Sequence, residues 1–84
     1  MQTKTTDAIQ DWLVAYLAKL LDMEPAKVDV DTPVERYGLD SAASIELVSE
    51  LADWLEIELE PTIVFDHRTI RGLAGYVGAN RSAA

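Results

Sequence analysis

The residues with the clearest chemical potential lie in a short segment, Gly38-Leu39-Asp40-Ser41, that leads from a turn into a helix. Gly38 can adopt the backbone angles of a turn without a Cβ clash. Asp40 and Ser41 each carry a short side-chain oxygen that can accept hydrogen bonds from the free amides of a helix's first turn. We therefore expect Ser41 to be exposed at a helix start, where the local pattern alone makes it a helix cap.

The single histidine, His67, could be combined with Ser41 and Asp66 into a hydrolytic triad on paper. In such a triad the histidine bridges the serine and the acid. Asp66 and His67 are neighbours in the sequence, so their side chains are not expected to be arranged in that way. The chain also lacks a phosphate loop, a dinucleotide fingerprint and zinc-ligand spacing. We expect no catalytic residues and no enzymatic activity of the chain alone.

The carboxylates of residues 29–40 invite a calcium interpretation, which their spacing rejects. In a twelve-residue calcium loop counted from Asp29, the sixth position would be Val34 instead of glycine, and the twelfth Asp40 instead of glutamate. We expect solvated loop carboxylates and no metal site.

Length and composition limit the architecture. The 84 residues leave room for one domain with one small core, and we expect it to span residues 1–84, with an ordered part of about 7–79 and frayed termini. The hydrophobic fraction of 49% is that of a globular protein. The sequence has no apolar run of about eighteen residues, as a membrane span requires, and we expect no secretory signal at its N-terminus. The absence of cysteine suits a cytoplasmic protein.

The net charge of −8, from 15 acidic and 7 basic residues, restricts the partners. Such a surface repels nucleic-acid phosphates and anionic lipids and attracts basic patches on other proteins. We expect a monomer that binds neither nucleic acid nor membranes.

Apolar spacing predicts two amphipathic helices, over residues 7–22 and 41–56, with Thr6 or Asp7 capping the first. The residues expected to face inward from the first are Ile9, Trp12, Leu13, Tyr16, Leu17, Leu20 and Leu21. Those from the second are Ser44, Leu47, Val48, Leu51, Trp54 and Leu55.

The long connection between these helices contains two prolines and is expected to form one helical turn over residues 33–37. Its expected anchors in the core are Val28, Val30 and Val34. Residues 57–60 are expected to be extended.

Two more helices follow the extended segment. The first is short, starts at Pro61 and has β-branched residues of weak helix propensity, so packing of Ile63, Val64 and Phe65 must hold it. Thr69 can cap the last helix, and Gly78 can end it. The apolar stripe of the last helix is Ile70, Leu73, Ala74 and Val77. The predicted fold is an all-α four-helix bundle with three longer helices, a short third helix and a long loop between helices one and two.

The segment around Ser41 resembles the modification site of acyl carrier proteins. The similarity covers Gly38-Leu39-Asp40-Ser41, Ile45-Glu46-Leu47-Val48 and the downstream segment Pro61-Thr62-Ile63-Val64-Phe65-Asp66-His67, within about residues 8–78. The downstream segment is more similar to carriers of polyketide synthases than to those of bacterial fatty-acid synthesis.

The resemblance implies that Ser41 receives a 4′-phosphopantetheine arm from coenzyme A, whose thiol carries acyl groups as thioesters in a polyketide or related lipid pathway. It assigns Asp40 and Leu39 to the cofactor site. It implies a phosphopantetheinyl transferase, an acyl-loading enzyme and ketosynthase- or acyltransferase-type enzymes with basic docking patches as partners.

The outward face of the second helix combines an exposed isoleucine with carboxylates, which suits a small transient docking patch. Its members are Ala42, Ile45, Glu46, Ser49, Asp53 and Glu56. Ala42 departs from the resemblance, because most carriers have a large apolar residue after the modified serine, so partner choice could differ. Two alternatives remain: a non-catalytic acidic helical interaction module, and a peptidyl carrier of nonribosomal peptide synthesis, against which the absence of a Gly-Gly-[His/Asp]-Ser pattern argues.

Overall fold

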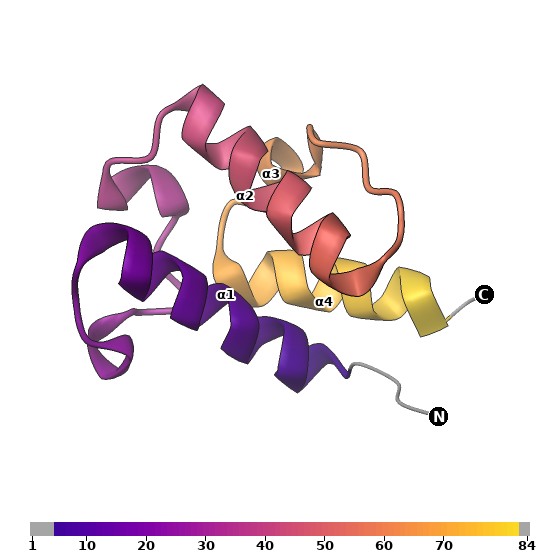
Figure 1. The fold of residues 1–84 in the computed structure, drawn as a ribbon, viewed down its shortest axis with the longest axis horizontal. Coiled ribbons are helices and arrows are strands. Elements are labelled where there is room, and N and C mark those ends of the chain that lie inside the picture. The colour runs from indigo at the N-terminus through magenta and orange to yellow at the C-terminus, as the bar shows by residue number, and fades with distance from the viewer. Residues whose placement is uncertain (1–4, 83–84) are drawn as a thin grey trace.

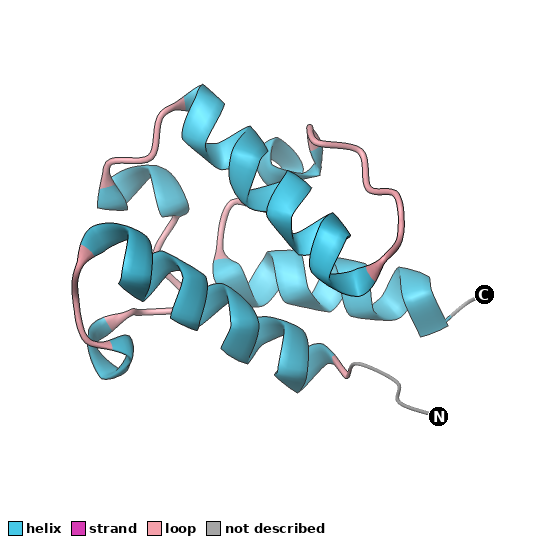
Figure 2. Ribbon diagram, viewed as in Figure 1, coloured by secondary structure: helices cyan, strands magenta, loops and turns pink. Residues whose placement is uncertain are grey.

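A computed structural model describes residues 5–82, and the side chains of residues 5–79. This part of the chain is helical and contains no strand (Figure 2). The elements in chain order are α1 (Thr6–Leu21), the 3₁₀ helices η1 (Pro25–Lys27) and η2 (Val34–Tyr37), α2 (Ser41–Leu55), α3 (Ile63–Asp66) and α4 (Ile70–Ser82). Residues 57–60 form an extended connection, as expected. The predicted fold class, with three longer helices, a short third helix and a long first loop, is confirmed. No described helix is long and apolar enough to cross a membrane.

The core lies between α1, α2 and α4, with α1 and α4 packed along each other (Figure 1). The expected stripes of α2 and α4 are confirmed, because their aliphatic members and Ser44 are buried and Trp54 packs against the core. The stripe of α1 is confirmed except at Leu20, whose side chain is 51% exposed. Leu20 lines an open groove between α1 and α2, together with Tyr16, Lys19 and Glu50.

The termini of the helices follow standard capping geometry. Thr5, not Thr6 or Asp7, caps α1, because its Oγ1 accepts a hydrogen bond of 3.1 Å from the amide of Ala8. After α1 and α2 the chain turns through a left-handed residue, Asp22 (φ 56°) and Glu56 (φ 58°) respectively. Glu56 therefore lies just outside the helix in which the sequence analysis placed it.

The last helix begins as expected but does not end at Gly78. The Thr69 hydroxyl accepts a hydrogen bond of 3.0 Å from the amide of Gly72. The helix continues through Gly78 to Ser82. A Cβ on Gly78 would collide with Thr6 Oγ1 and lie 3.3 Å from Thr6 Cα. Gly78 is thus a close-approach residue between α4 and the start of α1, and the expectation of a helix end there was wrong. Of the predicted frayed tail, residues 83–84 lie outside the described part.

The short helix α3 is held by two of the three residues proposed for it. Ile63 and Val64 are buried, whereas Phe65 is 37% exposed and lies at the rim of a cavity. A four-residue helix can turn only one side toward the core, so a third consecutive apolar residue must point elsewhere.

The long loop is fastened to the junction between α3 and α4. The amide of Val34 donates to the carbonyl of Arg68 at 2.8 Å, and that of Arg71 donates to Val30 at 3.0 Å. An ion pair joins Arg71 to Asp31 at 2.6 Å. The expected helical turn is present as η2. Two of the predicted anchors, Val28 and Val34, are buried, and Val30 packs partly against the core. Because this loop leads directly into Ser41, its fastening fixes where that residue lies.

Candidate functional site

Ser41 is exposed and is the first residue of α2. The chain reaches it through Gly38, whose φ of 92° lies in the left-handed region. Asp40 caps the helix, because its Oδ1 accepts a hydrogen bond of 2.8 Å from the amide of Ala43. Since Asp40 performs the capping, the Ser41 hydroxyl is not needed for it. Of the two roles that the sequence left open for Ser41, the structure gives the cap to its neighbour.

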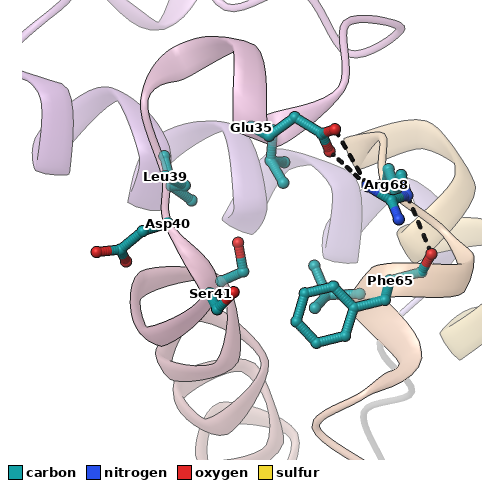
Figure 3. A pocket seen from close by; sticks show the side chains of 9 residues that line it. Glu35, Leu39, Asp40, Ser41, Phe65 and Arg68 are labelled. Carbon is teal, nitrogen blue, oxygen red and sulfur yellow. Dashed lines mark hydrogen bonds and ion pairs between the residues drawn. The ribbon is translucent and has the colours of Figure 1, made fainter.

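An open cavity of about 290 Å³ lies beside Ser41 (Figure 3). It is bounded by the start of α2, by η2 and the turn that follows it, by α3, and by Arg68, two residues after the end of α3. Leu39 and Ser44, which are 6% and 5% exposed, form part of the wall with Ser41 itself. The remaining lining residues are Val34, Glu35, Asp40, Val64, Phe65 and Arg68. Leu39 therefore lies where an arm resting in the cavity would meet it; its role in the cofactor site stays a prediction.

Arg68 is the one basic residue that lines this cavity. Its Nη1 donates to both carboxylate oxygens of Glu35, at 3.0 and 3.1 Å, and its Nε donates to the carbonyl of Phe65 at 3.1 Å. Figure 3 shows Arg68 and Phe65 across the cavity from Ser41, whereas the carboxylate of Asp40 points away from them. Neither Phe65 nor Arg68 could be connected with Ser41 from the sequence, because no local spacing links residues so far apart in the chain.

The predicted docking face lies on the outside of α2. Its members, Ala42, Ile45, Glu46, Ser49, Asp53 and Glu56, are all exposed. Glu50, one turn after Glu46, belongs to the same acidic surface and was missed, although the spacing of four residues could have indicated it. Burial, and then the negative charges of Glu46 and Glu50, raises the pKa of Tyr16 on α1. The acidic surface thus extends toward α1.

The histidine considered for a triad lies elsewhere. His67 stacks on Tyr76, with ring centroids 4.5 Å apart, and does not line the cavity beside Ser41. Within the described residues, no three histidine or acidic side chains are grouped as metal ligands.

The site suits a covalently attached chain that begins with a phosphate. An exposed hydroxyl starts a helix, whose positive dipole end favours a phosphate. The adjoining cavity offers the side chains of Leu39, Val64 and Phe65 to an aliphatic chain and Arg68 to an anion. The residues present therefore fit 4′-phosphopantetheine.

Comparison with known proteins supports this assignment. The family model described as "Phosphopantetheine attachment site" matches residues 11–77. An acyl carrier protein of Teredinibacter turnerae, TtuC, is 31% identical over 77 residues, which cover 92% of this chain and 88% of the relative. The polyketide synthase PksN of Bacillus subtilis is 34% identical over 84% of this chain, but the matched part is only 1% of that protein.

Solved structures of carriers share the fold. An acyl carrier protein from Anabaena sp. PCC 7120 with a variant phosphopantetheinylation-site sequence superimposes with a TM-score of 0.85 at 33% identity, covering 94% of this chain and 90% of that one. A free-standing peptidyl carrier protein from Acinetobacter baumannii superimposes with a TM-score of 0.82 at 32% identity, covering 93% and 98%. The sequence match, the helical bundle and the exposed serine beside its cavity agree, and the chain belongs to the phosphopantetheine-binding family of carrier proteins.

Proposed function

We propose that Ser41 is the attachment point of the 4′-phosphopantetheine arm and that the chain carries acyl intermediates as thioesters between enzymes of a polyketide or related lipid pathway. The observation that carries the proposal is the position of Ser41: exposed, first in α2, and beside a cavity that suits the arm. The acyl carrier and polyketide synthases among its relatives support the acyl class of cargo over the peptidyl class.

The attachment reaction asks little of the carrier itself. On a phosphopantetheinyl transferase, the Ser41 oxygen forms a bond to the β-phosphorus of coenzyme A, 3′,5′-ADP leaves, and the hydroxyl proton passes to the transferase or solvent. The carrier contributes an accessible hydroxyl on a rigid element. Because the chain has no cysteine, the thiol of the arm is the only one available for a thioester.

The test is incubation with coenzyme A and a broad-specificity phosphopantetheinyl transferase, followed by intact-mass measurement. The wild type is expected to gain one phosphopantetheinyl group, and Ser41→Ala none. Ser49→Ala, which removes an exposed hydroxyl from the same helix, and Ser44→Ala, which removes a buried one, are expected to gain it normally. No gain by the wild type, under conditions that prime a known carrier, would contradict the proposal.

The proposed partners are that transferase, an acyl-loading enzyme and ketosynthase- or acyltransferase-type enzymes with basic patches. The outer face of α2 supports this, because Ile45, 37% exposed, lies among carboxylates that can steer a basic partner. A plain interaction module would instead bind its partner regardless of Ser41 and coenzyme A. Pull-downs with primed wild type and with Ser41→Ala distinguish the two, because a carrier's capture by an arm-reactive enzyme depends on Ser41.

A further inference from the structure

The ion pair between Arg68 and Glu35 is arranged so that Arg68 can change its partner. The two side chains are 53% and 51% exposed, and pairs in such surroundings contribute little to stability. The backbone of Arg68 is nevertheless fixed. Its carbonyl accepts a hydrogen bond from the amide of Val34, and the next residue, Thr69, forms an isolated antiparallel β-bridge with Pro33. A change of partner would therefore involve the side chain alone.

A phosphodiester on Ser41 would alter the charge balance of the cavity wall. Glu35 already supplies a carboxylate beside Arg68, which is the one cation among the lining residues, whereas the carboxylate of Asp40 points away from Arg68. Two amides of the helix start already have partners, because that of Ala43 donates to Asp40 Oδ1 and that of Ser44 donates to the carbonyl of Asp40. The cation on the same cavity wall is then the natural partner of the added anion.

Resting on the proposed attachment at Ser41, we propose that Arg68 is a positioning residue for the arm. When Ser41 carries the phosphodiester, the Arg68 guanidinium leaves Glu35 and pairs with the phosphate oxygens. The first part of the arm then lies across the cavity against Phe65.

The chemistry of each group favours this exchange. A guanidinium can bind a phosphate through two parallel hydrogen bonds, whereas in the present pair one nitrogen, Nη1, serves both oxygens of Glu35, so the new pair can use a second donor. Glu35 is half exposed and returns to water without becoming a buried unpaired charge. The ring of Phe65, 37% exposed at the rim, gains apolar cover from the arm. The exchange also explains why the third apolar residue of α3 faces the cavity.

The test uses the primed full-length chain and two NMR signals. The first is the ³¹P resonance of the phosphodiester in wild type, Arg68→Gln, Arg68→Lys and Arg71→Gln. Arg71 is the matched control, because it forms a comparable exposed pair with Asp31 but does not line the cavity. The second is the Nε–H signal of Arg68 before and after priming, assigned in the wild type through its couplings along the Arg68 side chain to the backbone.

We expect Arg68→Gln to shift the ³¹P resonance toward its position in the urea-unfolded primed protein, and Arg71→Gln to leave it unchanged. Arg68→Lys, which keeps the charge, should remain closer to the wild type. The Arg68 Nε–H signal should move on priming while that of Arg71 stays. In about 1 M salt, where charges are screened beyond about 3 Å, the ³¹P difference should shrink.

An Arg68 Nε–H signal at the same position before and after priming, or a ³¹P resonance in Arg68→Gln identical to that of the wild type, would overturn the assignment. The wild-type Nε–H measurement decides the matter even if Arg68→Gln does not fold. If mass spectrometry shows complete priming but neither NMR signal responds, only the role of Arg68 is refuted, and the proposed attachment at Ser41 stands. A wild type that cannot be primed would instead refute the proposed function.

Discussion

At the scale of the residue, small side chains decide where the site and the packing can exist. Ser41 is free for modification because Asp40 caps the helix in its place. Gly78 allows α4 to approach Thr6 at the start of α1. Neither consequence follows from the residue type alone. The sequence identified Asp40 and Ser41 as joint candidates for the cap, and only the backbone geometry separates their roles.

The close approach at Gly78 makes a residue-scale prediction. Gly78→Ala places a methyl group against Thr6 and is expected to destabilise the fold by about 1–3 kcal/mol, as overpacking does. The matched control is Gly75→Ala in the same helix, where an added Cβ meets nothing within 4 Å. This control should stabilise the fold by about 0.5–1 kcal/mol through helix propensity. Urea unfolding measures both, and equal effects of the two substitutions would show that Gly78 has no packing role.

At the scale of the element, the two longest helices, α1 and α2, end in the same way. The amides of Met23 and Ile57 each bond to the carbonyl five residues earlier, at 2.9 and 3.1 Å, across a left-handed Asp22 or Glu56. Glycine is the usual residue at such a position, so an aspartate and a glutamate there do not indicate these helix ends strongly. Met23 and Ile57 then pack against the core and hold the turn in place.

The left-handed conformation of Glu56 predicts that glycine there is stabilising. The left-handed conformation costs a residue other than glycine about 1–2 kcal/mol. Replacement by glycine removes this cost, but the greater conformational freedom of glycine in the unfolded chain offsets about 0.5–1 kcal/mol of the gain. Glu56→Gly should therefore raise the free energy of unfolding by up to about 1.5 kcal/mol in urea titrations. Glu50→Gly, at an exposed interior position of α2, should lower it by about 0.5–1 kcal/mol. A loss of stability in Glu56→Gly would contradict the prediction.

The exposed face of α2 predicts how charge affects partner encounter. Joint charge reversal, Glu46→Lys with Asp53→Lys, should lower the kcat/KM of priming by the transferase several-fold at low salt, because steering by the acidic surface is lost. At about 1 M salt the difference should largely disappear. The control pair, Glu58→Lys with Glu60→Lys, changes the net charge equally in the exposed connection after α2. Equal rates for wild type and the α2 variant at low salt would exclude this face as the docking surface.

At the scale of the whole molecule, most of the fold could be predicted because the helices are strongly amphipathic. Leu13, Leu47 and Leu73 are buried where helical spacing placed them. The errors occur where tertiary packing decides. Leu20 continues the stripe of α1 but lines an open groove between α1 and α2, and Phe65 leaves the core because a one-turn helix buries only one side. The cavity beside Ser41 could not be predicted either, since Arg68 reaches it only through the contact between the long loop and the α3–α4 junction.

A core this small has little tolerance for a cavity. Leu51 is fully buried in the middle of α2, and Leu51→Ala should lower the free energy of unfolding by about 2–5 kcal/mol. That loss is a large fraction of the 5–15 kcal/mol, roughly, that holds a typical domain together. Thermal and urea unfolding followed by circular dichroism check the prediction. A variant as stable as the wild type would mean that Leu51 is not a central core residue.

The central claim is that one exposed hydroxyl, at the start of α2, is where the arm is attached. Fragmentation mass spectrometry of the enzymatically primed protein tests it most directly, because it locates the added group on a single residue. The expected result is one phosphopantetheinyl group, found on Ser41 and on neither Ser44 nor Ser49. An added group on another residue, or unmodified Ser41 after complete priming of a control carrier, would contradict the account.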